Sequence, residues 1–234
     1  MNDGRNALPQ PTGWDHAHLA VKAALAALPV AGSPAAELFA VIIAPPLARR
    51  RDAWLQSLAD GLSALQEKVA GFNAESLADN EAFVSVTMQA SRAALQTHQQ
   101  EKLEALRNAV LNVAAGRAPD EDEQATFLGY IDALTPWHIR VLRFFQDPAG
   151  LAAGRGVRMD RTMAGSLSEL FEQVFPDLLG RRDFYDQIAR DLHTRGFINS
   201  SADVLHVMMT GSGLVAKRTT DTADRFLAFI GAPV

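Results

Sequence analysis

Apolar residues recur at helical spacing over most of the chain. The longest stretch of this kind, residues 81–115, contains neither proline nor glycine, and a polar run at residues 96–100 interrupts its periodicity. This pattern predicts either one long helix or two helices that meet near the polar run. An apolar stripe at intervals of three or four residues predicts another helix before it. That stripe consists of Trp54, Leu58, Leu62, Leu65 and Val69.

Start signals place the helices in the second half of the chain. Ser166 and Glu169 have the spacing of a capping box, and Thr135, which precedes a proline, and Thr220 are typical residues before a first helical turn. The glycine-rich segment 149–165 predicts a mobile loop. The helices expected from these signals cover residues 120–134, 136–146, 166–175, 183–195 and 221–230.

The stretch between Leu19 and Leu47 is the most apolar part of the chain. A membrane-spanning helix needs about 20 uninterrupted apolar residues. Here prolines and a glycine interrupt the stretch, and it contains Lys22 and Glu37. We therefore expect two short helices buried in a helical core, with a membrane-inserting hairpin as the alternative.

Prolines determine where these two helices are expected to end. A proline lacks the backbone N–H and clashes with the preceding turn of a helix. A helix over residues 15–28 is expected to stop at Pro29, and a second one over residues 33–43 before the pair that begins at Pro45. Residues 1–14 are polar and contain prolines and glycines, which favours a flexible N-terminal arm.

The strand-like runs of the chain lie near its C-terminal end. Residues 204–209 and 214–217 flank the sequence Thr210-Gly-Ser-Gly213, whose residues favour a tight turn. A small β-hairpin is therefore expected there. The fold class is mainly α, with a helical region over residues 15–133 and a C-terminal module over residues 134–234 that contains this hairpin.

Composition excludes several function classes. The 234 residues include no cysteine, which removes thiolate nucleophiles, redox pairs and cysteine-bound metals, and fits a cytoplasmic location. The formal net charge is −5, with 22 Lys and Arg against 27 Asp and Glu, so no long-range positive field attracts nucleic acid. The N-terminus has no signal-peptide layout.

No catalytic motif occurs in the sequence. A metalloprotease HExxH, a nucleophile elbow GxSxG and a phosphate-binding GxxxxGK[ST] are all absent. His16 and His18 stand close together, but residues two apart do not share a helix face. We therefore expect a nonenzymatic protein with no catalytic residue, no metal and no cofactor.

Three segments of the C-terminal module carry a resemblance. Thr135-Pro-Trp-His-Ile-Arg-Val-Leu142 is similar to the first helix of a winged-helix domain, and Arg195-Gly-Phe-Ile198 to the exit from its third helix into a strand. The run from Lys217 to Ile230 resembles a wing strand that enters a closing helix at a threonine. The C-terminal part therefore resembles a winged-helix module over about 100 of the 234 residues. Winged helices bind proteins as well as DNA, so the resemblance leaves the function open.

Two short motifs carry a second resemblance, which extends over most of the chain. Pro29-Val-Ala-Gly32 lies in the apolar N-terminal part, and Leu134-Thr-Pro136 precedes the winged-helix-like part. In this order they resemble bacterial abortive-infection proteins of the Abi-alpha type. That resemblance implies a role in stress or phage defence and supplies no catalytic residue.

Basic residues mark the candidate nucleic-acid contacts. In a winged helix the third helix enters the major groove. Here it would present Arg181, Arg182 and Arg190, and the wing would add Lys217 and Arg218. Residues 151–234 contain ten basic and ten acidic residues, whereas a DNA reader is usually basic on this surface. DNA binding is therefore the alternative rather than the first expectation.

A second basic cluster lies at the start of the helix that carries the Trp54 stripe. Arg49, Arg50 and Arg51 place positive charge at the positive end of the helix dipole, which is unfavourable by itself. Neutralisation by Asp52 and other acids is one explanation. Contact with an anion or an acidic partner is the other.

The expected function follows from these exclusions. We expect a nonenzymatic bacterial protein-interaction or regulatory protein that binds a protein partner or self-associates. Long helices with apolar stripes commonly form two-fold dimers, which favours a homodimer. A winged-helix DNA-binding regulator is the first alternative, and a membrane-active effector that uses the stretch from Leu19 to Leu47 is the second.

Overall fold

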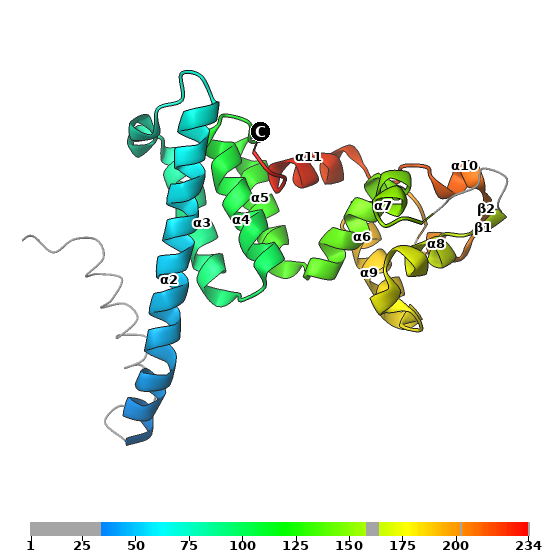
Figure 1. Ribbon diagram of the computed structural model, residues 1–234, viewed down its shortest axis with the longest axis horizontal. Helices are drawn as coiled ribbons and strands as arrows, with labels where there is room; N and C mark the ends of the chain where they lie inside the picture. Colours follow the sequence, from blue (N-terminus) through cyan, green and yellow to red (C-terminus); the bar gives the residue numbers. More distant parts are fainter. Residues whose placement is uncertain (1–33, 158–163, 202, 234) are drawn as a thin grey trace, which may run out of the picture. The chain divides into compact units, whose positions relative to one another are not determined.

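The computed structural model describes residues 34–157, 164–201 and 203–233. These residues are mainly helical and include one small antiparallel sheet of two strands, which confirms the expected fold class (Figure 1). The chain divides into two compact units, residues 1–52 and 53–234. The arm at residues 1–14, the helix expected at residues 15–28 and the Pro29 motif lie outside the described residues.

Helix α2 (Pro34–Lys68) begins in the first unit and corrects one prediction. It continues through Pro45 and Pro46, where the sequence predicted a break between two helices. Each proline removes one backbone hydrogen bond, but a helix can continue past such a gap when the turns on both sides remain bonded. Around this position Val41 and Ile42 are exposed to solvent.

The second unit begins with the part of α2 that carries the predicted stripe. Trp54, Leu58 and Leu65 are buried, and the Trp54 indole N–H donates a hydrogen bond to Ser91 Oγ at 2.9 Å. A short 3-10 helix, η1 (Ala74–Asp79), follows. The buried stripe confirms the helix that the sequence predicted here.

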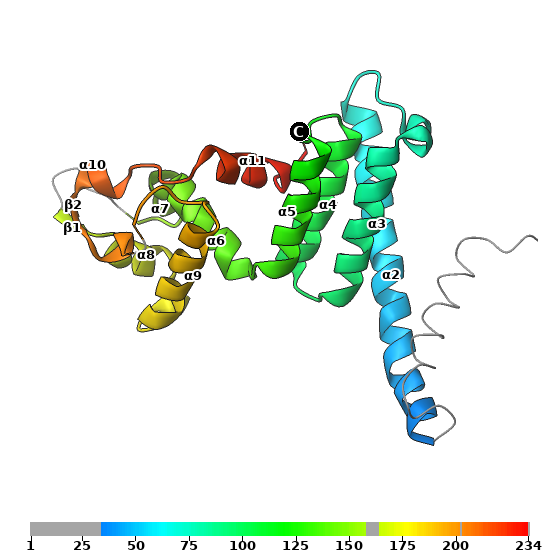
Figure 2. The ribbon, with the colours of Figure 1, turned by 180° about the vertical axis from the view of Figure 1, so that it is seen from behind.

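Three helices form the packed bundle of this unit: α3 (Glu81–Gln96), α4 (Gln100–Ala114) and α5 (Glu121–Ala133). They lie side by side in both views (Figures 1 and 2). The polar run therefore separates two helices, which confirms the second of the two alternatives that the sequence predicted. Asn80 caps α3 and Asp120 caps α5, each accepting a backbone N–H three residues later.

The next elements follow the predicted start signals with one difference. They are α6 (Pro136–Gln146), α7 (Pro148–Gly154), β1 (Ala164–Ser166), α8 (Leu167–Val174), η2 (Pro176–Leu178) and α9 (Arg182–Thr194). The capping box of Ser166 and Glu169 at the start of α8 is present. Helix α7 lies where the sequence predicted only a loop, because Asp147 accepts the N–H of Gly150 and Pro148 occupies the first helical position.

The small sheet joins segments that are distant in the sequence. After η3 (Val204–His206), strand β2 (Met208–Thr210) pairs antiparallel with β1, with Gly165 opposite Met209. The sequence analysis predicted the second strand of the hairpin at residues 214–217, and this position is wrong. Residues 211–214 form a short helix, α10 (Gly211–Leu214), so the chain does not fold back there as a second strand. The last helix is α11 (Asp221–Phe229), which Thr220 caps as expected.

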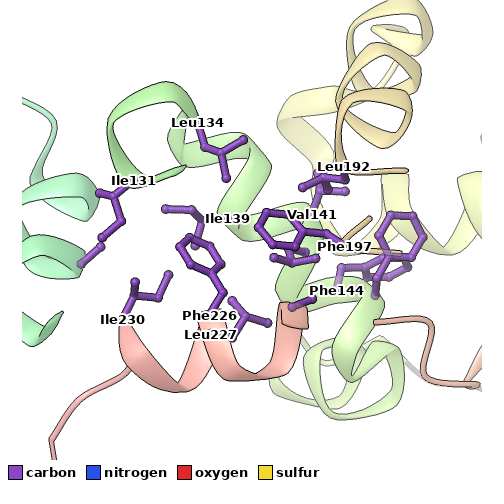
Figure 3. Packing of buried hydrophobic residues seen from close by; sticks show 14 of the residues in the cluster. Ile131, Leu134, Ile139, Val141, Phe144, Leu192, Phe197, Phe226, Leu227 and Ile230 are labelled. Carbon is purple, nitrogen blue, oxygen red and sulfur yellow. The ribbon is translucent and has the colours of Figure 1, made fainter. Parts of the chain in front are cut away.

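A continuous hydrophobic core connects the bundle with the helices that follow it. Figure 3 shows Phe226 and Leu227 of α11 near Ile139 of α6, and Phe197 near Val141 and Phe144; all belong to one core. The rings of Phe226 and Phe197 stack at 5.2 Å between centroids, and Phe226 also meets Phe127 edge to face. Helix α11 therefore holds α5 and α6 in place from one side.

Two buried asparagines of α4 bind the C-terminal end of α11. The Asn112 side-chain amide donates to the carbonyl oxygens of Phe229 at 2.9 Å and of Gly231 at 3.0 Å. The Asn108 amide donates to the Ile230 carbonyl at 3.1 Å. The last carbonyls of a helix have no partner within the helix, so these amides satisfy groups that would otherwise be buried without one.

The boundary predicted between residues 133 and 134 falls inside the second unit and stays a prediction. None of the described helices is long and apolar enough to cross a membrane.

Candidate functional site

A cleft of about 460 Å³ opens where α4, α6 and α9 begin. Its size is within the range of about 300–1,000 Å³ that is typical of ligand sites. Helix α9 contributes an aromatic side chain, α6 contributes an aromatic and a cationic one, and α4 contributes amides and a carboxylate. The lining residues are Gln99, Gln100, Glu101, Thr135, Pro136, Trp137, Arg140 and Phe184.

Local sequence fixes the two helix starts that form one side of the cleft. At α6, the Thr135 N–H donates to His138 Nδ1 at 3.2 Å, and Pro136 supplies a preset backbone angle at the first position. At α4, the Gln99 N–H donates to Thr97 Oγ1 at 3.1 Å, which turns the chain into the helix. Both helices therefore begin at the cleft because of residues next to it in the sequence.

An ion pair connects α4 with α6 across the cleft. The Arg140 Nε–H donates to Glu101 Oε2 at 3.0 Å, and a second guanidinium nitrogen donates to Oε1. This two-point geometry is the strong form of an arginine–carboxylate contact. The hydrogen bond from Arg140 to Glu101 raises the pKa of the guanidinium. Each side chain remains 38% exposed, so the pair stays open to a ligand from solvent.

The aromatic walls of the cleft each carry a cation. The Arg140 guanidinium carbon lies 4.6 Å from the centre of the Trp137 ring, and that of Arg181 lies 4.4 Å from the centre of the Phe184 ring. Trp137 also packs edge to face on Phe175, at 5.6 Å between ring centres, which fixes its orientation. The cleft therefore combines apolar ring surface with the guanidinium of Arg140, whereas Arg181 contacts the Phe184 ring without being one of the lining residues.

His138 lies behind the cleft and links α6 to α9. Its Nδ1 accepts from the Thr135 N–H, and its Nε2 lies 3.5 Å from Asp191 Oδ2. Burial lowers the pKa of His138, and the hydrogen bond with Asp191 opposes this effect. An acceptor at Nδ1 requires the neutral imidazole, so the cap at the start of α6 depends on this charge state.

Comparison with known proteins supplies no relative for this arrangement. No protein-family model, no curated protein and no solved structure matches the chain. The winged-helix and abortive-infection resemblances therefore stay predictions. The chemistry of the site is argued from the residues of this chain.

The cations predicted on the third helix of the module lie on α9 and at its start. Arg181 is exposed, and its guanidinium lies over the Phe184 ring. Arg182 lies 3.9 Å from Asp186 Oδ2, and Arg190 donates to Gln187 Oε1 at 3.2 Å. Acidic side chains alternate with the arginines along this helix, since Asp183 and Asp186 lie between Arg182 and Arg190, and Asp191 follows.

The two cations predicted on the wing lie in different environments. Lys217 forms an ion pair with Asp224 of α11. Arg218 is only 6% exposed, and its guanidinium donates to the backbone carbonyl oxygens of Gly213 and Ala216. Burial lowers the pKa of Arg218. Its side chain therefore holds α10 in place and does not face a nucleic acid.

The second basic cluster belongs to the first unit. Arg49 and Arg50 are exposed on α2. Arg51 forms an ion pair with Asp52 at 2.9 Å, as expected if Asp52 neutralises part of the cluster. Among the described residues, no group of three or more side chains of the metal-binding types comes together.

Sequence reasoning did not single out the residues that line the cleft. The sequence did indicate that helices begin near Gln99, after Thr135 and near Arg181, since a polar run, a Thr-Pro pair and a glycine precede them. The convergence of three helix starts depends on tertiary packing, which the local pattern does not contain. A search for aromatic and arginine side chains in the first two turns of helices would have found Trp137, Arg140 and Phe184.

Proposed function

We propose that this chain is a nonenzymatic protein-interaction or regulatory protein of the bacterial cytoplasm, and that its cleft binds a segment of a partner protein. The observation that carries the proposal is the cleft with its aromatic walls and its Arg140–Glu101 pair. Aromatic and arginine side chains are the types that contribute most at protein interfaces.

The composition of the cleft favours a peptide segment over a reacting substrate. Trp137 and Phe184 offer ring surface for an apolar side chain, and the exposed amides of Gln99 and Gln100 can bond to a peptide backbone. The Glu101 carboxylate already accepts two hydrogen bonds from Arg140. Binding, rather than general acid and base chemistry, is what this set of groups can perform.

A winged-helix DNA-binding regulator is the second candidate. The order α6, β1, α8, α9 followed by the bridge between Ile198 and Thr219 supports it, because a winged helix has this order of elements, although here the additional helix α7 lies between α6 and β1. In this reading Arg181, Arg182 and Arg190 would contact DNA. The alternation of these arginines with carboxylates on α9 favours the protein partner instead.

The abortive-infection resemblance makes stress or phage defence the proposed setting. Self-association as a homodimer is part of the same proposal. The membrane-active alternative depends on the stretch from Leu19 to Leu47, of which the structure describes only the residues from Pro34 onwards.

Photo-cross-linking from the cleft tests the proposal. A photoreactive benzoylphenylalanine replaces Gln100 in the full chain, expressed in its native bacterium, and a matched variant carries it at Asp122, an exposed residue at the start of α5. We expect a discrete adduct with one partner protein from position 100 and none from position 122.

The partner, identified by mass spectrometry, is then purified and titrated against the protein by calorimetry. Phe184→Ala removes one wall of the cleft and should weaken binding at least tenfold, a loss of about 1.4 kcal/mol. Equal adducts from both positions, or an affinity that Phe184→Ala leaves unchanged, would contradict the proposal.

A further inference from the structure

We infer that His138 makes the cleft sensitive to pH: its neutral imidazole holds the first turn of α6, which forms one wall of the cleft, and protonation releases that turn. This inference rests on the proposed function, because it concerns the regulation of the same cleft. It follows from the hydrogen bonds of His138, from the place of the turn in the cleft and from the charges that face the imidazole.

The imidazole of His138 is the acceptor for the backbone at the start of α6. Its Nδ1 accepts the Thr135 N–H at 3.2 Å and lies 2.8 Å from Thr135 Oγ1. A backbone N–H at the start of a helix has no partner within the helix, so this nitrogen supplies the one that is missing. A proton on Nδ1 changes the nitrogen from an acceptor into a donor. The Thr135 hydroxyl can accept from the protonated ring, but the Thr135 N–H loses its partner.

The turn that this hydrogen bond holds is part of the cleft. Thr135, Pro136 and Trp137 all line it, and they are consecutive residues at the start of α6. The other walls come from α4 and α9, whose starts do not depend on His138. Protonation of His138 therefore loosens the wall that carries the Trp137 ring, and a segment bound against this ring loses an ordered surface.

Two charges at the C-terminal end of α9 face His138. Its side chain is 11% exposed, and this burial lowers the pKa of the imidazole. Asp191 favours the charged form, but its Oδ2 lies 3.5 Å from Nε2, which is long for a hydrogen bond. The positive charge of Arg195 disfavours the charged form. The imidazole is therefore expected to take up its proton below pH 6.5.

The other helices packed against α6 leave this balance unchanged. Helix α7 consists of proline, alanine, glycine and leucine, so it has no ionisable side chain. In α11, Asp224 accepts from Gln146, about 12 Å along α6 from His138, and Arg225 pairs with Glu123 of α5. Among the described residues, the charges that decide the protonation of His138 are thus those on α9.

Amide hydrogen exchange, measured by NMR on the full chain without a partner, tests the release of the turn. Histidine resonances in the same sample give the folded-state pKa of His138. One pH unit below it, we expect the protection factor of the Thr135 amide, corrected for the intrinsic rate at each pH, to fall about fivefold, as for the loss of one hydrogen bond. The Phe83 amide is the internal control, because its acceptor, Asn80 Oδ1, does not titrate.

Three substitutions separate His138 from other effects of pH. Glutamine at this position completes a capping box with Thr135 and accepts its N–H at every pH, so His138→Gln should abolish the pH response of the Thr135 amide. His193→Gln, at an exposed position of α9, should leave the response unchanged. Asp191→Asn removes the carboxylate that favours the imidazolium and should move the midpoint of the response to lower pH.

The affinity of the partner cross-linked from position 100 is the second measurement. One pH unit below the pKa of His138, only about one molecule in eleven has the neutral imidazole, so binding should be about tenfold weaker. His138→Gln should reduce this loss to about twofold or less.

The outcomes separate this inference from the proposed function. A Thr135 protection factor that stays constant while His138 titrates, or that falls equally in His138→Gln, would overturn the inference and leave the proposed function standing. A partner affinity that falls equally in the unmodified protein and in His138→Gln would overturn the regulation of binding by this turn. Failure of position 100 to give an adduct, together with a pH-dependent Thr135 amide, would overturn the proposed function and support the release of the turn.

Discussion

Substitution of Asn112 tests how α11 is attached to the bundle. Its amide lies on the buried side of α4, where the residue is 5% exposed, and it donates two hydrogen bonds of 2.9 and 3.0 Å to carbonyls at the end of α11. A buried hydrogen bond contributes about 1 kcal/mol net, and a buried acceptor left without a partner costs about 1–3 kcal/mol. Asn112→Ala should therefore lower the free energy of unfolding by about 2–3 kcal/mol.

Urea denaturation followed by circular dichroism measures this change. For a unit of this size, a loss of that magnitude corresponds to about 5–10 °C in the melting temperature. Gln89→Ala, on the exposed side of α3, is the control and should change stability by less than about 0.5 kcal/mol. An Asn112→Ala variant no less stable than this control would refute the view that the α4 amides hold the end of α11.

Three further predictions follow from the same structure. Burial lowers the pKa of His138 below 6.5 in the folded protein, so the free energy of unfolding should fall as the pH drops from 6.5 through the folded-state pKa. Histidine NMR titration measures that pKa, and a value at or above 6.5 would contradict the prediction. Ser166→Ala removes the capping box of α8 and should lower the free energy of unfolding, measured with denaturant, by about 1 kcal/mol. Ser85→Ala, at an exposed position of α3, should leave that free energy unchanged. Phe226→Ala should cost about 3–5 kcal/mol, since its ring is fully buried among three aromatic rings; a loss below 1 kcal/mol would show that α11 does not complete the core.

Helix starts were predictable because the groups that determine them are neighbours in the sequence. The Ser166 cap with Glu169, the Thr135-Pro136 start of α6 and the Thr220 cap of α11 all act within three residues. The polar run between α3 and α4 likewise marks a real break. In each case local hydrogen bonding decides the structure, so one segment contains the required information.

The errors concern features that distant parts of the chain decide. Strand β2 pairs with β1, and three residues are too few to show the alternation of apolar and polar positions that identifies a strand in a sequence. The pairing of the two strands also depends on how α8 and α10 pack against them. The Pro45–Pro46 pair is a different case, because it is a local signal for a helix end and the turns around it nevertheless remain helical. The cleft belongs to the same class as the sheet, because Glu101, Trp137 and Phe184 come together only after three helices have packed. A sequence pattern of period 3.6 identifies the buried side of a helix but not the helix that covers it.

The affinity of the cross-linked partner for the protein and for its Phe184→Ala and Gln89→Ala variants is the most direct test of the central claim. If the cleft binds a segment of this partner, Phe184→Ala weakens binding at least tenfold, and Gln89→Ala, on the exposed side of α3, leaves it unchanged. If both variants bind as tightly as the unmodified protein, the account of the cleft as the recognition site is wrong.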